Sequence, residues 1–126
     1  MRILLDTHAL LWASKGTLSR KAVALLEDTA NQLYFSSVSI WEIELKRNKL
    51  RIDPKAFYQN LVSRGYQELP MSTRHVLSLS QLPTLHSDPF DRVLLAQALS
   101  EQIYLLTDDE ELIRYSDYLD FIQVYE

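Results

Sequence analysis

Carboxylate side chains that could share a metal ion occur at four places along the 126-residue sequence. Carboxylates held within about 4 Å of one another near a protein surface repel by on the order of 4 kcal/mol per pair, and a hard divalent cation relieves that repulsion. The sequence has no cysteine and no H-x-x-x-H spacing, so oxygen ligands point to Mg²⁺ or Mn²⁺ rather than to zinc. The candidate acids are Asp6, Glu42, Asp88, Asp91, Asp108 and Asp109.

Two of these acids have a structural interpretation that competes with the chemical one. Asp6 stands where a strand is expected to give way to a helix, so it could be an N-cap that accepts backbone N–H groups. Glu42 follows Ser39 by three residues, which is the spacing of a capping box. For Glu42 the pattern favours the capping role over the chemical one.

The later acids stand at two predicted helix starts. Asp88 precedes Pro89, the preferred first residue of a helix, and is therefore expected to be an N-cap. Asp91 would lie in the first turn, where the helix dipole favours a carboxylate. Asp108 is a natural cap for a short helix after it, whereas the role of Asp109 stays open.

Short apolar strands that alternate with helices would position these acids. Uniformly apolar strands of this length indicate a parallel sheet covered on both faces, and residues just after the carboxyl ends of such strands converge on one crevice. The predicted fold is α/β, a three-layer sandwich with a short-stranded, mainly parallel central sheet, forming a single domain over residues 1–126. Strands are expected at 2–5, 33–35, 66–69, 103–106 and 122–124, and helices at 7–14, 20–26, 40–45, 54–64, 73–79, 89–100 and 109–115.

Composition excludes several classes of protein. A chain with 47% hydrophobic and 24% charged residues can bury a core, so disorder is not expected. Two glycines are too few for a phosphate loop, a dinucleotide fingerprint or a hydrolase elbow. The absence of cysteine excludes a thiol nucleophile and suits a reducing compartment. An acid at position 6 comes too early for a secretory signal, and no apolar run is long enough for a membrane span, so a cytoplasmic protein without membrane contact is expected.

Charge is distributed unevenly along the chain. The net charge is −4, and residues 108–126 hold seven acids and one basic residue. A nucleic-acid site would therefore have to be local. The one basic cluster could be such a site, or only the solvated face of a helix and its exit loop, which is the interpretation the pattern alone favours. It consists of Lys46, Arg47, Lys49, Arg51 and Lys55.

Four segments, taken in this order and spacing, resemble the PIN-domain ribonucleases and, within them, the toxins of VapBC-type toxin–antitoxin pairs. Each segment alone would be a weak signal, whereas the set spans nearly the whole chain. The segments are 4–12 (LLDTHALLW), 36–43 (SSVSIWEI), 86–92 (HSDPFDR) with 94–98 after it, and 105–109 (LLTDD).

The resemblance implies a cluster of acids that binds Mg²⁺ or Mn²⁺ and cleaves RNA. By position, the catalytic acids would be Asp6, Glu42, Asp91 and Asp109. The metal would be held by Asp6, Asp91 and Asp109, while Glu42 would orient the attacking water or hold a second ion. Thr107 matches the small hydroxyl residue beside the last acid. Asp91 is preferred to Asp88 because Asp88 has a capping role, and Asp109 is chosen over Asp108 from the resemblance.

Partners also follow from the resemblance. The substrate would be RNA, cut to leave a 5'-phosphate and a 3'-hydroxyl, and a small antitoxin would neutralise the protein. A homodimer is expected. The basic side chains that would grip the RNA backbone are Lys46, Arg47, Lys49, Arg51 and Arg92.

Two other functions are compatible with clustered acids. A signalling receiver domain also gathers acids at strand ends, but it needs a lysine after a late strand, and the segment 105–108 (LLTD) offers none. A catalytically idle PIN scaffold would keep the fold and bind partners only. The complete set of acids argues against the idle scaffold.

Overall fold

Five parallel strands form the central sheet of this computed structural model, which describes residues 1–118 and 122–124. The strand order is β3-β2-β1-β4-β5, and each described pairing is parallel. The central strand β1 and its neighbour β4 therefore end side by side, with Leu5 opposite Leu106. The strands are β1 (Arg2–Leu5), β2 (Gln32–Ser36), β3 (Gln67–Leu69), β4 (Tyr104–Thr107) and β5 (Ile122–Val124).

Consecutive residues of the central strands enter different cores, because side chains alternate between the two faces of a sheet. Ile3 and Leu5 of β1 lie in one hydrophobic core, and Leu4 lies in the other. On β4, Leu106 joins the first core and Leu105 the second. Burial on both faces explains why these strands are uniformly apolar.

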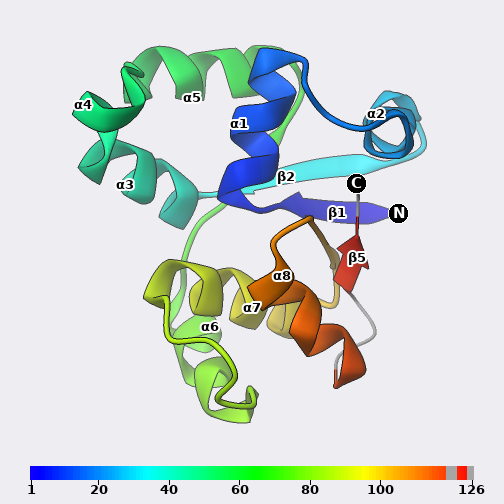
Figure 1. Cartoon of the computed structure of the whole chain (residues 1–126), viewed down its shortest axis with the longest axis vertical. Helices are drawn as coiled ribbons and strands as arrows, with labels where there is room; N and C mark the ends of the chain where they lie inside the picture. Colours follow the sequence, from blue (N-terminus) through cyan, green and yellow to red (C-terminus); the bar gives the residue numbers. More distant parts are fainter. Residues whose placement is uncertain (119–121, 125–126) are drawn as a thin grey trace.

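Helices cover both faces of the sheet (Figure 1). The first core is closed by α1 (Thr7–Lys15), α2 (Arg20–Glu27), α3 (Ser37–Leu45), α4 (Arg47–Leu50) and α5 (Pro54–Ser63). The second is closed by α7 (Pro89–Glu101), α8 (Glu110–Ile113) and the 3₁₀ turns η1 (Ser78–Gln81) and η2 (Arg114–Asp117), while α6 (Thr73–Leu77) packs against α7 and η1. The predicted α/β three-layer fold is confirmed.

Two of the predicted helices end in 3₁₀ turns. The helix expected over 73–79 ends at Leu77 and tightens into η1, and the one expected over 109–115 ends at Ile113 and tightens into η2. The break expected at Gly16 is present: this glycine adopts φ 71° and its N–H closes the last turn of α1 on Ala13 and Trp12. Within the part of the chain that the structure describes, no helix is long and apolar enough to cross a membrane.

Candidate active site

Asp6 lies at the carboxyl end of β1 and begins α1. Its side chain is 1% exposed. One carboxylate oxygen accepts the Ala9 N–H at 2.7 Å, and the other accepts the Thr107 hydroxyl at 2.5 Å. Asp6 is thus both an N-cap and a buried acid that the end of β4 holds in place.

Thr107 joins the first acid to the last one. While its hydroxyl donates to Asp6, the same oxygen accepts the Asp109 N–H at 3.0 Å. Asp109 then caps α8 by accepting the Glu111 N–H at 2.9 Å. The expectation that Asp108 is the cap was wrong. Because Thr107 fixes the Asp109 backbone, α8 begins at Glu110 and the exposed Asp108 lies outside it.

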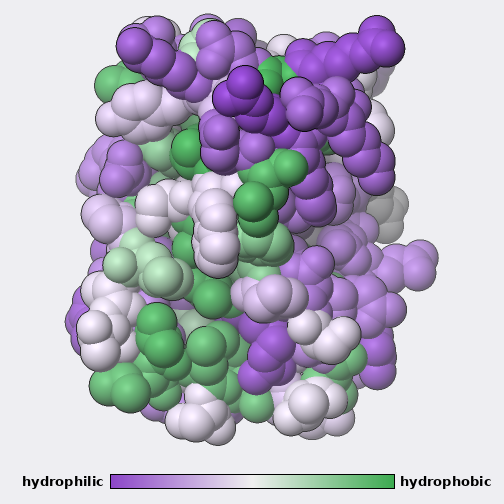
Figure 2. Space-filling model, turned by 90° about the vertical axis from the view of Figure 1, so that its left-hand side faces the viewer, coloured by the Kyte–Doolittle hydropathy of each residue, from purple (hydrophilic) through white to green (hydrophobic). Residues whose placement is uncertain are grey.

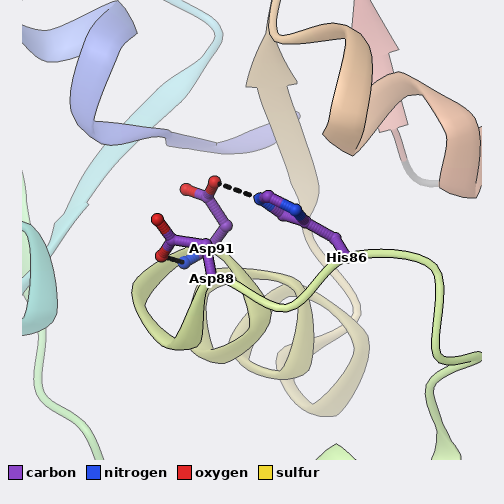
Figure 3. A group of neighbouring side chains, drawn as sticks. All are labelled: His86, Asp88 and Asp91. Atoms are coloured by element: carbon purple, nitrogen blue, oxygen red, sulfur yellow. Dashed lines mark hydrogen bonds and ion pairs between the residues drawn. The ribbon is translucent and has the colours of Figure 1, made fainter.

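The start of α7 places two further acids on one side of the helix (Figure 3). Asp88 accepts the N–H groups of Phe90 at 2.9 Å and Asp91 at 3.2 Å, which confirms its predicted N-cap role. Asp91 is 9% exposed, and its Oδ2 lies 2.8 Å from Nε2 of His86. One possible ligand atom from each of His86, Asp88 and Asp91 lies within 4.8 Å of the others.

Glu42 approaches from α3 and is 6% exposed. Its Oε2 accepts a hydrogen bond from Nζ of Lys46 at 2.7 Å. Its Oε1 is buried and has no hydrogen-bond partner among the described residues. A buried carboxylate oxygen without a partner is costly, and a cation or its water is the kind of ligand that would satisfy it.

The capping box expected between Ser39 and Glu42 was wrong. The helix begins earlier, at Ser37, and Ser36 caps it by accepting the Val38 N–H at 3.0 Å. Ser39 is therefore inside α3, where its buried hydroxyl accepts from Thr7 at 2.9 Å. Glu42 is freed from capping and can serve the site.

The buried acids shift one another's pKa values. Burial raises the pKa of Asp6 to about 7, although hydrogen bonds from Thr107 and Ala9 lower it, and the charge of Asp91 raises it further. Burial also raises the pKa of Asp91, the hydrogen bond with His86 opposes that rise, and the charges of Asp88 and Asp109 add to it. Asp91 therefore lies at the centre of the mutual repulsion.

Lys46 supplies positive charge at the same place. The hydrogen bond with Glu42 raises the pKa of Lys46 against the opposing effect of burial, and the charges of Glu42, Asp88 and Asp91 raise it as well. The end of α3 thus faces the start of α7. The structure brings Asp6, Glu42, Asp88, Asp91 and Asp109 to one edge of the sheet.

The acid cluster fits a hard divalent cation. Its donors are carboxylate oxygens from several elements, and one of them, Glu42 Oε1, lacks a partner in the described part of the chain. Oxygen donors in this number suit Mg²⁺ or Mn²⁺. The group at ligand distance is His86, Asp88 and Asp91, which shares only Asp91 with the predicted set of Asp6, Asp91 and Asp109.

His86 is the site residue that sequence reasoning missed. The H-x-x-x-H pattern places a second histidine one helical turn away, whereas His86 pairs with the carboxylate of Asp91. The signal was present in the segment His86-Ser87-Asp88-Pro89-Phe90-Asp91, because Pro89 fixes the first helical turn and so fixes which acid faces back toward the preceding loop.

The basic residues divide into an exposed group and an inward one. Lys46, Arg47, Lys49 and Arg51 are exposed, at the end of α3 and over α4. Arg92 is turned inward instead: its guanidinium donates to the carbonyl groups of Leu79, Pro83 and His86 at 3.4 Å and to the Tyr115 hydroxyl at 3.3 Å. The carbonyl groups of Leu79 and Pro83 also accept the backbone N–H groups of Leu82 and Leu85, so Arg92 gives them a further donor. Its guanidinium thereby holds together the segment 79–86, which runs from the end of η1 into a loop.

The capping role of Asp88 can be separated from its charge by comparison with Asp53, which caps α5 before Pro54 in the same arrangement. We expect Asp53→Ala to lower the free energy of unfolding by about 1 kcal/mol. Asp88→Ala should cost less than that in EDTA, because it also relieves repulsion on Asp91. Asp88→Asn keeps a good cap and should be at least as stable as the parent. Chemical denaturation in EDTA measures all three, and equal losses for the two alanine variants would contradict the expectation.

Comparisons with known proteins agree with this architecture. A family model described as the PIN domain matches residues 3–118. The chain therefore belongs to the PIN-domain family, as its four motifs predict, and the receiver-domain alternative is set aside. No curated protein gives a significant match.

Similar solved structures come from VapBC complexes. VapBC2 from Rickettsia felis, bound to a DNA fragment from their promoter, has a TM-score of 0.75 at 16% identity over 100% of both chains. DNA-bound VapBC from Salmonella typhimurium has a TM-score of 0.72 at 18% identity over 98% of this chain and 96% of that one. VapBC-1 from nontypeable Haemophilus influenzae has a TM-score of 0.69 at 17% identity, with 98% of each chain covered. At these identities the likeness shows a shared fold.

Proposed function

We propose that the chain is a metal-dependent endoribonuclease that cleaves RNA phosphodiester bonds in the cytoplasm and serves as the toxin of a toxin–antitoxin pair. The observation that carries the proposal is the convergence of acids from β1, α3, α7 and the β4–α8 turn, with Asp91 at the centre of their repulsion. Acids that served only as separate helix caps would have no reason to lie together at one edge of the sheet. A shared cation would account for this clustering.

Asp6, Asp91 and Asp109 would hold Mg²⁺ or Mn²⁺, with Asp88 and His86 beside Asp91. Such an ion polarises a phosphate oxygen, acidifies a water and stabilises charge in the transition state. Glu42 would orient the attacking water through Oε1, which has no hydrogen-bond partner among the described residues, while Lys46 holds the other carboxylate oxygen. Thr107 keeps Asp6 and Asp109 at a fixed separation.

The exposed cations of α3 and α4 would bind the RNA backbone. Figure 2 shows the face that carries these helices, with hydrophilic side chains gathered over its upper part. Lys46, Arg47, Lys49 and Arg51 are solvated there, so their contribution should weaken as salt is raised. Arg92 is left out of this surface because its guanidinium is occupied by the 79–86 loop.

The test is cleavage of total cellular RNA by the purified chain with Mn²⁺ or Mg²⁺, with and without EDTA. We expect cleavage that EDTA abolishes and that excess Mn²⁺ restores. Asp53→Asn removes a charge from an equivalent helix cap outside the cluster, so it is the matched control for variants that remove a charge from the cluster itself. A folded chain that cleaves no RNA with either metal would favour the idle scaffold, and cleavage in EDTA would exclude the metal mechanism.

Neutralisation by an antitoxin is part of the same proposal. The surplus of acids at the site would attract a basic side chain, and an arginine fork suits paired carboxylates. The solved structures with this fold were determined as VapBC complexes, which supports a protein partner. Expression of the chain alone should arrest growth, and co-expression with an adjacent small gene should restore it and yield a complex. A soluble, folded chain that is harmless at high level would contradict the toxin assignment.

We also propose that the chain forms a homodimer. Light scattering on the eluting peak should give twice the 14.7 kDa of one chain. A mass of one chain at micromolar concentration would contradict it.

His86 provides a prediction that does not depend on activity. Its ring orients Asp91, and residues that orient a metal ligand typically change metal affinity about 10- to 100-fold when removed. We therefore expect His86→Ala to weaken Mn²⁺ binding by about that factor while the chain stays folded. Isothermal titration with Mn²⁺ measures it, and an unchanged dissociation constant would show that Asp91 is held without His86.

A further inference from the structure

Trp41 is a large aromatic side chain that the fold leaves 55% exposed, one residue before the buried Glu42. Its indole and the ring of Phe90 form a T-shaped pair, with ring centroids 5.0 Å apart and an angle of 72° between the planes. Phe90 lies in the first turn of α7, between Asp88 and Asp91. The aromatic pair therefore joins the two helices that carry three acids of the site.

The T-shaped contact with Phe90 leaves the side chain of Trp41 more exposed than buried. An edge-to-face pair uses the rim of one ring and leaves much of the indole's surface free, which agrees with the large exposed fraction of Trp41. An open, oriented aromatic face is the surface on which unpaired nucleobases stack in nucleic-acid-binding proteins.

Positive charge next to the pair favours RNA as the occupant. Lys46 follows Trp41 by five residues, and the charges of Asp88 and Asp91 act on its ammonium group. Arg47 and Lys49 continue the positive charge along α4. An aromatic face bordered by cations, beside an acid cluster suited to a metal, matches a nucleotide's base and phosphate. Lys46 and Arg47 are paired with Glu42 and Glu44, and a phosphate would add an acceptor for these cations, whereas a purely apolar partner helix would offer them none.

We propose that Trp41, held by Phe90, is a stacking platform for a nucleobase next to the cleaved phosphate and thereby selects unpaired RNA. The inference rests on the proposed ribonuclease function and adds a specificity-determining residue to it. A base within a duplex is stacked on its neighbours, so only an unpaired base would reach the indole.

Binding without cleavage tests the platform directly. The probe is a fluorescein-labelled, unstructured 12-nucleotide RNA of mixed sequence, titrated with the full chain in EDTA. We expect Trp41→Ala to weaken binding on the order of tenfold and Trp41→Tyr to retain most of it. The matched control is Trp12→Ala, which removes the other tryptophan, 42% exposed on α1. In the Trp12→Phe background, the emission of Trp41 should be quenched by the RNA.

The second part of the binding experiment uses the same RNA probe annealed to its complementary strand. We expect the duplex to bind more weakly than the single strand and to be insensitive to Trp41→Ala. Equal affinity of Trp41→Ala and the parent for the single strand would overturn the platform, as would a parent chain that binds no RNA. Loss of antitoxin binding in Trp41→Ala with RNA binding intact would overturn it in favour of a protein interface.

The cleavage assay separates the platform from the function on which it rests. Metal-dependent cleavage with the same KM in Trp41→Ala and the parent would overturn the platform alone. A Trp41-dependent loss of RNA binding by a chain that never cleaves would support the platform and overturn the ribonuclease.

Discussion

Asp91→Asn is expected to reduce metal-dependent RNA cleavage by on the order of 10²–10³-fold or more while the fold survives. The amide keeps the shape of the side chain and can still accept from His86, but it removes a charge from the centre of the cluster. Burial and the charges of Asp88 and Asp109 raise the pKa of Asp91, so the variant should be at least as stable as the parent in EDTA. Rate measurements with Mn²⁺ and melting curves in EDTA check both parts.

Asp88→Asn is the side-by-side control for Asp91→Asn. It lies on the same helix turn and caps α7, so it should stay folded and retain most of the cleavage. If Asp88→Asn were the inactive variant and Asp91→Asn cleaved normally, the third acid would be Asp88 and the ligand set would have to be reassigned.

Adding Mn²⁺ should raise the melting temperature by about 10 °C near neutral pH. Free metal at about 100 times its dissociation constant stabilises the folded state by roughly 2.7 kcal/mol, and 1 kcal/mol shifts the melting temperature of a domain of this size by about 4 °C. The ion binds the folded acids, which are far apart in the unfolded chain. Melting curves in EDTA and in Mn²⁺ measure the shift.

The increase in melting temperature that Mn²⁺ causes should become larger as the pH rises. Burial raises the pKa of Asp6 from 3.8 to about 7, so folding favours its protonated form. Stability from this group is complete below about pH 4 and is lost as the pH rises through about 7 in the absence of metal. Bound metal takes the place of that proton, so the difference between Mn²⁺ and EDTA should be small near pH 5 and large near pH 8.

Asp6→Asn serves as the control for the pH effect. An amide cannot ionise and can still cap α1, so the decline of stability between about pH 4 and about pH 7 in EDTA should flatten. A melting temperature that is the same in Mn²⁺ and EDTA at every pH would contradict metal binding at this cluster.

Patterns within short stretches of the sequence predicted the fold and the N-cap of α7 well. The uniformly apolar strands indicated a sheet buried on both sides, and the separate cores that receive Leu4 and Leu5 bear this out. Asp88 before Pro89 is a cap because proline fixes the first helical turn with neighbouring residues alone. Such features depend on a few consecutive residues and can be inferred from them.

Features that depend on distant residues could not be inferred in the same way. Ser39 and Glu42 have capping-box spacing, yet the helix starts two residues before Ser39, and the Ser39 hydroxyl pairs with Thr7. Asp109, rather than its neighbour, caps α8 because Thr107 holds its backbone while also binding Asp6. These outcomes are set by contacts across the sheet, which sequence spacing does not report.

The direction of the Arg92 side chain is another feature that sequence spacing could not predict. Its place next to the acid motif suggested RNA contact, whereas its guanidinium is used by carbonyl groups of the loop over 79–86. Whether an arginine faces solvent or its own backbone depends on how that loop folds. The resemblance identified an arginine at this position but did not indicate where its guanidinium points.

Three acids of the site are also helix caps: Asp6 begins α1, Asp88 begins α7 and Asp109 begins α8. Backbone N–H groups hold these carboxylates in position, and the positive ends of the helix dipoles offset part of their repulsion. The ion-free chain is therefore a preorganised receptor and not a loop that must order around its ligand. We expect loading to proceed without a folding phase, so that the chain returns to full activity through repeated cycles of chelation and reloading as fast as the ion diffuses in.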